Sequence, residues 1–469
     1  MKEIRVCAVD IGGGSTRGLL GCFDGERLTL RESGRFSSNV INLGRAAYWN
    51  FGSLFDNVTR VIGEAQKDGA IDCVGIDSFG GTTCFIDREG RLLENPTYGR
   101  DPNMSRWISQ AEPLLSVEEL SGAAGYKMSA EYRQFLKLRY LTYFRRGLAS
   151  EIDKILFLPS ALNYYLTGSV YAEHSYAVTL QFCNYTEPVW QYEAMKLAGI
   201  ERDQLPQILP SGTILGSMLP NICEMTGLRA CRIAAVTEHD SASAMSILAE
   251  EGMDCIFLNQ GTMAVLSAPV KEPVLTDDFI MSGCGNELSY GGTIRLTRNH
   301  GGLWLVQQCR NYWNHAGLCT DYSYLEQEAA RAEAGKFLFD VDDPKLRVPG
   351  NTPGMISERC GKMLSQGETI RAIYDSLAHT YLKTIHSFAE ASGQTYRRIR
   401  ALGGGHNSAL LSQIIADTTG LPVISGPAEA TALGNICVQL ITSGAVGSMT
   451  EASELLSRTD AYKMYEPRI

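Results

Sequence analysis

No stretch of eighteen apolar residues occurs anywhere in the 469 residues, so no membrane span is predicted. The first ten residues combine a short apolar run with charges at Lys2, Glu3 and Arg5. They predict a strand rather than a signal peptide, which needs a longer apolar core. The 13 cysteines form no CxxC pair, and no cysteine or histidine pair has the spacing of zinc ligands. We therefore expect reduced cysteines that serve as small core side chains in a cytoplasmic protein.

Positive charge is scarce as well. Lysine and arginine total 42 against 52 aspartates and glutamates, which gives a formal net charge of -10. The phosphates of a nucleic acid would be repelled over most of such a surface, so nucleic acid is not an expected partner. Hydrophobic residues make up 44% and charged residues 20%, as is typical of soluble globular proteins. The length suits two domains with separate cores, and a local basic pocket for a small phosphate ligand stays compatible with the charge.

The first part of the chain predicts a mixed α/β unit. Three strands of a meander are expected at Ile4–Val9, from Arg17 to about Phe23, and at Arg27–Glu32, with glycine-rich turns between them. A helix with one apolar face follows from Ser53 to about Lys67, and then strands at Cys73–Asp77 and Thr82–Ile86. Antiparallel strands followed by helix-linked strands indicate a mixed sheet. The middle of the chain, roughly 105 to 230, is expected to be mostly helical.

A second α/β unit begins with the strand Ile233–Val236 and the helix Ser241–Glu251. Strands at Cys255–Leu258 and Met263–Ala268 then flank Gly261, as the first two strands flank their glycines, so we expect a diverged duplication of one sheet topology. The last third alternates between helix and strand: helix 369–391, strand Ile399–Leu402, helix Ser408–Thr418, strand Pro422–Ser425 and helix Ala428–Ser443. The Ser241–Glu251 helix is the expected hinge, because it joins the two repeats.

The first motif that could carry chemistry is Asp10-Ile-Gly12-Gly-Gly-Ser15-Thr16-Arg17, between two strands. Its glycines let the backbone turn tightly and present several N–H groups to one anion, and Ser15 and Thr16 add hydroxyl donors. Asp10, at the strand end, is placed to hold a hydrated Mg²⁺ on phosphates. The spacing fits neither the dinucleotide-binding nor the P-loop signature. A glycine-rich hairpin turn without a ligand is the alternative.

The second motif is Glu238-His239-Asp240-Ser241, directly after an apolar strand. Asp240 would lie at the N-terminus of the next helix, where the helix dipole favours its ionised form. There it could accept a proton from a sugar hydroxyl. The alternative is that Asp240 only caps the helix, and both roles can hold together.

The third motif, Asn259-Gln260-Gly261-Thr262-Met263, is another strand–turn–strand with donors at the bend. In a duplicated architecture it would face the first glycine hairpin across a cleft, and two such hairpins could hold a polyphosphate from opposite sides. A surface β-turn without a ligand is the simpler interpretation of this motif taken singly.

The fourth motif, Gly403-Gly404-Gly405-His406-Asn407, lies between a strand and a helix. Three glycines permit the close approach of a flat ligand such as adenine or its ribose. The alternative is a tight turn in which Asn407 caps the helix. All four motifs follow strands, where ligand sites collect in α/β folds, and their spread over the whole chain suits a cleft between two halves.

These motifs, in this order and spacing, resemble those of the FGGY carbohydrate kinases, and within that family the rhamnulokinase branch. Further matching segments are Ile76-Asp77-Ser78-Phe79-Gly80, Asn299-His-Gly-Gly302-Leu-Trp304-Leu-Val-Gln307, Leu410-Leu411-Ser-Gln413 and Glu429-Ala-Thr431-Ala-Leu-Gly434-Asn435. The resemblance runs nearly end to end. It implies an α/β protein with two ribonuclease-H-like domains of the actin and hexokinase type, residues 1–243 and 244–469, with ATP and sugar meeting in the interdomain cleft.

The resemblance also implies roles for individual residues. Asp240 would be the proton acceptor, and the sugar would be surrounded by Gly80, His239, Asp240, Ser241 and Asn299. ATP would contact Gly13, Gly14, Ser15, Thr16, Arg17, Thr262, Gln307 and Gly404. Asp10 would bind the Mg²⁺ that accompanies ATP.

The implied reaction is transfer of the γ-phosphoryl group of ATP to the C1 hydroxyl of a 6-deoxy-ketohexose, with L-rhamnulose as the first candidate. Rhamnulokinases usually have Trp-Gly-Val-Asp where this chain has Phe79-Gly80-Gly81-Thr82, so an indole and an acidic residue are missing beside the sugar. L-Fuculose or another ketose of the xylulose or ribulose type therefore stays open. A non-catalytic, actin-like nucleotide-binding protein is the rival from another class. The expected partner is a small sugar, and the sequence is compatible with a monomer or a homodimer.

Overall fold

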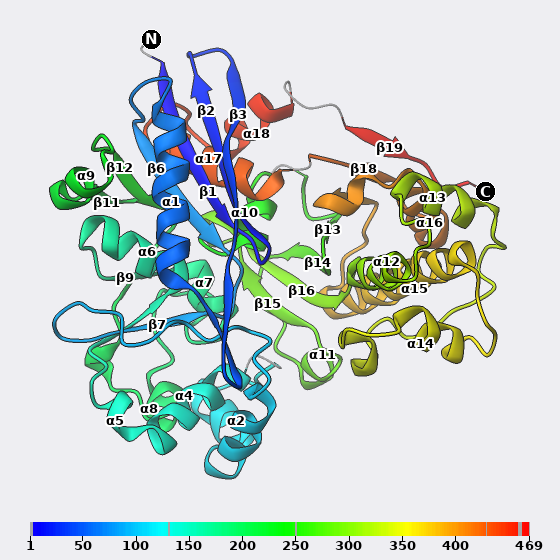
Figure 1. Ribbon diagram of the computed structural model, residues 1–469, viewed down its shortest axis with the longest axis horizontal. Coiled ribbons are helices and arrows are strands. Elements are labelled where there is room, and N and C mark those ends of the chain that lie inside the picture. Colours follow the sequence, from blue (N-terminus) through cyan, green and yellow to red (C-terminus); the bar gives the residue numbers. More distant parts are fainter. Residues whose placement is uncertain (1–2, 130–131, 249–250, 428, 458–461, 469) are drawn as a thin grey trace.

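The protein contains two large β-sheets, each with helices packed on it (Figure 1). The computed structural model describes residues 3–129, 132–248, 251–427, 429–457 and 462–468. The first sheet has six strands in the order β11-β12-β6-β1-β2-β3. Their bounds are β1 (Ile4–Ile11), β2 (Ser15–Phe23), β3 (Leu28–Ser37), β6 (Cys73–Ser78), β11 (Thr213–Ser217) and β12 (Arg232–Ala235).

The second sheet has seven strands in the order β15-β16-β14-β13-β17-β18-β19. Their bounds are β13 (Cys255–Gln260), β14 (Met263–Val270), β15 (Gly285–Leu288), β16 (Ile294–Gly301), β17 (Arg398–Leu402), β18 (Val423–Ser425) and β19 (Lys463–Tyr465). Three short pairs complete the strands: β4 (Val40–Leu43) with β5 (Ala46–Trp49), β7 (Thr83–Ile86) with β8 (Lys154–Phe157), and β9 (Tyr171–Glu173) with β10 (Gln207–Leu209).

The predicted duplication is visible in the two sheets. In the first, β1 pairs antiparallel with β2 and parallel with β6, while β3 lies outside β2 and β12 lies outside β6. In the second, β13 pairs antiparallel with β14 and parallel with β17, while β16 and β18 occupy the corresponding outer places. Both sheets therefore have the same central order and strand directions, and the predicted mixed α/β class is confirmed.

The helices before the middle of the chain surround the first sheet and extend below it in Figure 1. They are α1 (Phe51–Gln66), α2 (Met104–Ala111), α3 (Val117–Ala124), α4 (Tyr132–Phe144), α5 (Arg146–Ala149), α6 (Leu158–Thr167), α7 (His174–Thr179), α8 (Tyr192–Leu197) and α9 (Pro220–Thr226). The amphipathic helix predicted from Ser53 is α1, whose buried Leu54, Val58 and Ile62 join the core on one face of this sheet.

The remaining helices follow β12. They are α10 (Asp240–Ser246), α11 (Asp277–Met281), α12 (Trp304–His315), α13 (Tyr322–Arg331), α14 (Thr352–Arg359), α15 (Gln366–Ser392), α16 (Ala409–Thr419), α17 (Ala430–Thr442) and α18 (Met449–Ser457). No helix in the described ranges has both the length and the apolar character needed to cross a bilayer.

Helix α17, which comes late in the chain, packs on the first sheet. It packs on β1 and crosses α10, and Ala244, Leu433 and Ile436 share a core with Val6 and Ala8 of β1. The expected hinge helix is shorter than predicted, because α10 ends at Ser246 and not at Glu251. The backbone amide of Leu248 bonds to the carbonyl oxygen of Met245 (3.1 Å), a tighter turn that ends the α-helical pattern.

Candidate active site

The glycine-rich turn between β1 and β2 is an open hairpin. The amide of Gly12 donates to the carbonyl oxygen of Ser15 (2.9 Å) and closes the turn. A Cβ built on Gly13 or Gly14 would have no heavy atom within 4 Å, so the backbone at this point is open to a ligand. Backbone N–H groups at such a turn suit an anion.

Asp10, half-buried at the end of β1, lies beside the fully buried carboxyl group of Asp77 in β6. The two residues are partners in the parallel β1–β6 ladder. Burial and the neighbouring charge of Asp240 raise the pKa of Asp10 to about 6, and Arg17 opposes that rise. Burial and the charge of Asp10 raise the pKa of Asp77 well above its usual range. The three carboxyl groups therefore influence one another electrostatically.

Asp77 was not predicted as a site residue. Nδ2 of Asn435 in α17 donates to its Oδ2 (2.6 Å), whereas its Oδ1 is buried and has no partner among the described residues. Asp77 was named only as part of the family-like segment Ile76-Asp77-Ser78-Phe79-Gly80. Its position beside Asp10 depends on the pairing of β1 with β6, which no sequence signal reveals.

Asp240 is the first residue of α10. The N-cap position is held by His239, whose side chain makes no capping bond, so Asp240 is not the N-cap residue. Oδ1 of Asp240 instead accepts from the amide (2.6 Å) and the hydroxyl (3.2 Å) of Ser241. The side chain is 31% exposed, and Nε2 of His239 lies 3.4 Å from the same Oδ1. No hydrogen bond to Oδ2 is present among the described residues. One carboxylate oxygen is thus held while the other can accept a proton from a ligand.

The loop before Asp240 is tied to the end of β6. The amide of Ser78 donates to the carbonyl oxygen of Glu238 (2.9 Å), and a parallel bridge joins Ser78 to His239. The side chain of Glu238 is fully buried and accepts from the hydroxyls of Tyr171 and Ser160, the latter at 2.7 Å. Burial first, and the charge of Glu173 second, raise the pKa of Glu238 to about 8. The loop that leads into Asp240 is therefore held in place by a buried polar network around Glu238.

A large cavity lies between the two halves next to His239. Its volume is about 810 Å³, and four of the five residues predicted to surround the sugar line it: Gly80, His239, Ser241 and Asn299. Asp240, the fifth, stands between two lining residues in the chain. A Cβ on Gly80 would lie 3.1 Å from Nε2 of His239, so the imidazole packs directly on the Gly80 backbone. Nδ1 of His239 bonds to the hydroxyl of Thr179 (3.1 Å), which orients the ring.

The second glycine hairpin, between β13 and β14, is bonded to the start of α12. The amides of Leu303 and Trp304 donate to the carbonyl oxygens of Gly261 and Thr262, each at 3.0 Å. A Cβ on Gly302 would lie 2.6 Å from the carbonyl carbon of Met263, so only glycine fits at this approach. Thr262 is exposed at the tip of the hairpin, and Gln307 lies half-buried on α12.

The third glycine run packs against the second hairpin. A Cβ on Gly405 would lie 2.7 Å from Cβ of Gln260, whereas a Cβ on Gly404 would meet nothing within 4 Å. Gly405 thus permits tight packing against Gln260, whereas Gly404 is open to a ligand. The structure corrects the predicted cap: Ser408, not Asn407, accepts from the amide of Leu411 (3.1 Å) at the start of α16.

Two side chains of the first hairpin have partners within the protein. Thr16 is fully buried, and its hydroxyl bonds to that of Ser38 (3.4 Å), so the predicted hydroxyl donor does not face an open cleft. Arg17 forms an ion pair with Glu429 at the start of α17. The backbone N–H groups and Ser15, which is half-buried, are what this hairpin offers a ligand.

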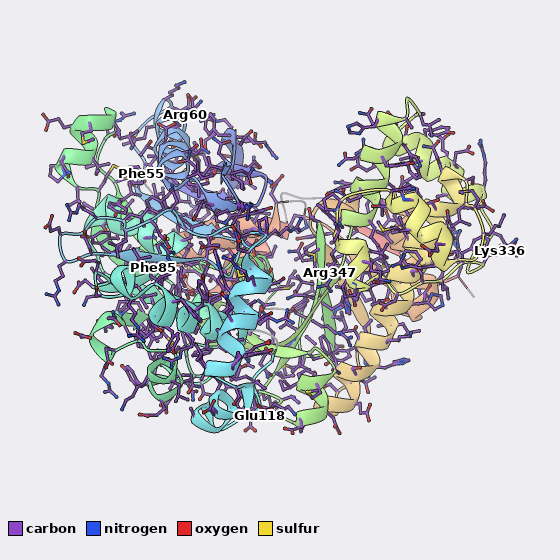
Figure 2. All side chains as sticks on the ribbon, turned by 60° about the horizontal axis from the view of Figure 1, so that its bottom comes forward. Phe55, Arg60, Phe85, Glu118, Lys336 and Arg347 are labelled. Atoms are coloured by element: carbon purple, nitrogen blue, oxygen red, sulfur yellow. The ribbon has the colours of Figure 1, made fainter. Side chains whose placement is uncertain are left out.

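The segment 320–368 supplies two residues to the cavity, Asp342 and Arg347. Asp342 bonds to Nδ1 of His300 (2.7 Å) and accepts from the amide of Gly301 (2.8 Å), beside the second hairpin. Arg347 is an exposed lining residue between the two halves of the molecule, as Figure 2 shows. Neither residue had a sequence signal, because the segment reaches the cleft only through the tertiary fold.

Comparison with known proteins assigns the chain to a family. Residues 6–246 match the N-terminal domain and residues 258–443 the C-terminal domain of the FGGY family of carbohydrate kinases. A rhamnulokinase of Bacteroides thetaiotaomicron is 30% identical over 470 residues, covering 98% of this chain and 95% of that protein. A rhamnulokinase of Enterococcus faecalis is 27% identical and covers 98% and 93%.

Solved structures agree at the level of the fold. A gluconate kinase from Lactobacillus acidophilus superposes with a TM-score of 0.82 at 17% identity, covering 100% of this chain and 94% of that one. A xylulose kinase from the same organism gives 0.81 at 16% identity, covering 99% and 94%. The predicted fold of two actin- and hexokinase-like α/β domains is confirmed. The chain belongs to the FGGY family of carbohydrate kinases and is an ATP-dependent sugar kinase.

Proposed function

We propose that the enzyme transfers the γ-phosphoryl group of ATP to the C1 hydroxyl of a 6-deoxy-ketohexose, with L-rhamnulose as the first candidate and L-rhamnulose 1-phosphate as its product. The observation that carries this proposal is the position of Asp240 beside the 810 Å³ cavity, with one carboxylate oxygen held by Ser241 and the other without a partner among the described residues. The rhamnulokinases among the relatives support the choice of sugar.

In this proposal Asp240 orients the acceptor hydroxyl and takes its proton late in the transfer. Phosphoryl transfer depends mainly on alignment and charge neutralisation, which the backbone amides at Gly13 and Gly14 and the exposed Thr262 would supply. His239, held by Thr179, would bond to the sugar beside the reacting hydroxyl. Gln307 and the open Gly404 would contact the nucleotide.

Asp10 is the residue that would hold Mg²⁺. Magnesium is usually bound through one or two carboxylates together with phosphate oxygens and water, not by an all-protein cage. Asp10 fits that pattern, because it can supply one carboxylate and lies next to the open phosphate hairpin. The ion would neutralise charge on the transferred phosphate, and Asp77 would orient Asp10.

We also propose that residues 1–243 and 244–469 act as two domains that close over the sugar. Closure would exclude water, which competes with the sugar as phosphoryl acceptor. The guanidinium of Arg100 over the ring of Trp304 (4.6 Å) and the ion pair of Lys127 with Asp277 (3.3 Å) each join one proposed domain to the other. Such contacts support a closed arrangement across the cleft.

Other ketoses are the second candidate. An indole does lie at the Phe79 segment, because Trp49 stacks on Phe79 with ring centroids 4.4 Å apart, but it comes from β5 and is buried. The acidic residue missing at Thr82 has no such replacement there: Thr82 is buried, with its amide facing the hydroxyl of Tyr176 (3.3 Å). Because this segment differs from that of rhamnulokinases, L-fuculose, L-ribulose and L-xylulose are to be tested beside L-rhamnulose.

ADP release by the purified protein with Mg-ATP across these four sugars tests the proposal. A strong preference for L-rhamnulose supports it, and a preference for another sugar replaces the substrate while keeping the kinase reaction. A non-catalytic nucleotide-binding protein would show no stimulation by any sugar.

A further inference from the structure

Two side chains that line the 810 Å³ cavity next to His239 each have a buried polar atom without a hydrogen-bond partner among the described residues. These atoms are Oε1 of Gln181 and Oγ1 of Thr297. Gln181 is 2% exposed and Thr297 is 7% exposed. A buried polar atom without a partner destabilises a folded protein, so such atoms on side chains that line a ligand cavity indicate that the ligand supplies the missing bond.

Gln181 is held in an unusual backbone conformation. It follows α7 and has a φ of 57°, the one positive φ of a non-glycine residue in the described ranges. Such a conformation is disfavoured for a residue with a Cβ, and it collects at functional sites. The hydroxyl of Tyr185 accepts from Nε2 of Gln181 (3.1 Å), so one half of the amide is fixed and the other is left for a ligand.

Thr297 shares its sheet face with a charged pair. Thr297 is the ladder partner of Gly285, and Glu287 is the partner of Arg295, so all four residues lie on one face of β15 and β16. Glu287 lines the cavity and forms an ion pair with Arg295, which is 1% exposed and donates to the hydroxyl of Ser267 (2.8 Å). Arg295 thus lies behind the carboxylate and fixes it from the protein side.

Glu287 also faces the site already described. Its Oε2 lies 3.8 Å from Nδ1 of His239, the residue next to the proposed base. Helix α7, which leads into Gln181, packs on β15, which carries Glu287. Gln181 and His239 come from the first half of the chain, and Glu287 and Thr297 from the second, so the group is complete only when both halves meet at the cavity.

We propose that Gln181, Glu287 and Thr297 recognise the hydroxyl groups of the acceptor sugar away from its reacting end, and that they restrict the enzyme to neutral sugars. This inference rests on the proposed kinase reaction at the same cavity. The carboxylate of Glu287 accepts hydrogen bonds and donates none, so it pairs with sugar hydroxyls and repels a carboxylate or phosphate on the sugar. A site built to bond a hydroxyl also discriminates strongly against the analogue that lacks it.

Basic residues on the same cavity point to the opposite class, an acidic sugar. Arg133 and Arg347 line it and are exposed, and Arg298 is half-buried near Cys284. Solvent screens the charges of the exposed Arg133 and Arg347 and, in part, that of Arg298, whereas Glu287 is a buried carboxylate (8% exposed). The buried group therefore dominates selection of the acceptor, and exposed arginines favour the entry of ATP, which is itself an anion.

The test measures sugar binding by calorimetry and ADP release in parallel, with wild type, Gln181→Met, Thr297→Val and Glu287→Gln. Thr293→Val, an exposed threonine before the same strand and outside the cavity lining, is the control. We expect Gln181→Met and Thr297→Val each to weaken binding of the neutral sugar about ten-fold or more, while the KM for ATP stays within about two-fold. A deoxy analogue lacking the recognised hydroxyl should bind the wild type weakly and lose nothing further in the matching variant.

The charge of the acceptor gives a second readout. Wild type should bind neutral ketoses and reject D-gluconate. In Glu287→Gln the ratio of the affinity for a neutral ketose to the affinity for D-gluconate should be smaller than in wild type. Binding of neutral sugar unchanged within about two-fold in both Gln181→Met and Thr297→Val overturns the inference, as does preferred binding of gluconate by the wild type or the absence of binding by any neutral sugar. If a neutral sugar binds and the variants lose it, but no ADP is released, the inference stands and the proposed reaction falls.

Discussion

Gly434 of α17 lies so close to Ser243 of α10 that a Cβ on Gly434 would stand 2.7 Å from the carbonyl carbon of Ser243 and would overlap its oxygen. The hydroxyl of Ser243 donates to the carbonyl oxygen of Thr431 (2.9 Å) at the same crossing. Because α10 begins with Asp240, the position of the proposed base depends on how closely these two helices approach.

Gly434→Ala should therefore lower both stability and turnover. Overpacking at a helix crossing costs about 1–3 kcal/mol, and here the clash is with backbone, which cannot rotate away. Urea unfolding and ADP release measure the two effects. Gly122→Ala is the control, because Gly122 is an exposed residue of α3 with nothing within 4 Å of the added Cβ, and it should stabilise the protein slightly. An unchanged urea midpoint for Gly434→Ala would contradict the close crossing.

Asp240→Asn should keep the fold and ATP binding and lose nearly all turnover. The amide can still accept from Ser241, but it cannot take the proton of a sugar hydroxyl. Steady-state ADP release measures the loss, and thermal unfolding checks the fold. Turnover above about a tenth of the wild-type value would exceed what the loss of a base allows and would sink the assignment.

Gly80→Ala should weaken sugar binding selectively. The added Cβ would stand 3.1 Å from Nε2 of His239, so the imidazole must shift by a few tenths of an ångström away from its place beside the sugar. We expect the KM for the sugar to rise about ten-fold, with the KM for ATP little changed. Gly99→Ala is the comparison, since Gly99 lines the same cavity but has free space at its Cβ. Equal effects of both variants would show that the contact with His239 is unimportant.

Asp10→Asn should raise the Mg²⁺ concentration needed for half-maximal ADP release, because one anionic ligand of the ion is lost. Sugar binding in the absence of nucleotide should stay the same. The measurement is a Mg²⁺ titration at saturating ATP and sugar. If the Mg²⁺ requirement does not change, Asp10 is not a ligand of the ion.

Glu238→Gln should change how stability depends on pH. Burial and Glu173 raise the pKa of Glu238 from 4.5 to about 8, so the folded protein holds this proton more tightly than the unfolded chain does. Its contribution to stability is complete below pH 4.5 and is lost as the pH rises through about 8. Across that window the wild type should lose up to about 1.4 kcal/mol per pH unit relative to the variant, which cannot ionise there.

Urea unfolding of both proteins at about pH 5.5 and about pH 8.5 measures this difference. Parallel pH profiles for the two proteins would mean that Glu238 is not a buried acid in the folded state.

Local sequence patterns were sufficient to locate many of the strands and helices and several residues of the candidate site. Alternation and glycine turns located β1, β2, β13 and β14, and helical spacing located α1 and α15, since these signals arise from residues close together in the chain. The strand–Gly–strand echo predicted the duplication. Gly80, His239, Ser241 and Asn299 were named from motifs and do line one cavity. The assignment of each to the sugar or to ATP stays a prediction.

The local signals failed at helix ends and where a side chain bonds to a distant segment. The Ser241–Glu251 helix was predicted too long, and the cap considered as the alternative role of the third glycine run lies at Ser408 and not at Asn407. Helix ends depend on turn geometry that spacing does not encode. Thr16 looked like a free hydroxyl donor, but the neighbouring strand β3 leads into Ser38, which takes its hydrogen bond.

By itself the sequence determined the family, the mixed α/β class, the duplicated sheets and the turns at which a ligand can meet the backbone, because the motifs and elements that indicate them each consist of residues close together in the chain. Only the tertiary structure decided that Asp77 lies beside Asp10, that Gln181 faces the cavity shared with Glu287 and Thr297, and that Arg347 reaches it. Those relations join residues scores of positions apart, and they depend on strand order and helix packing, which no local spacing records.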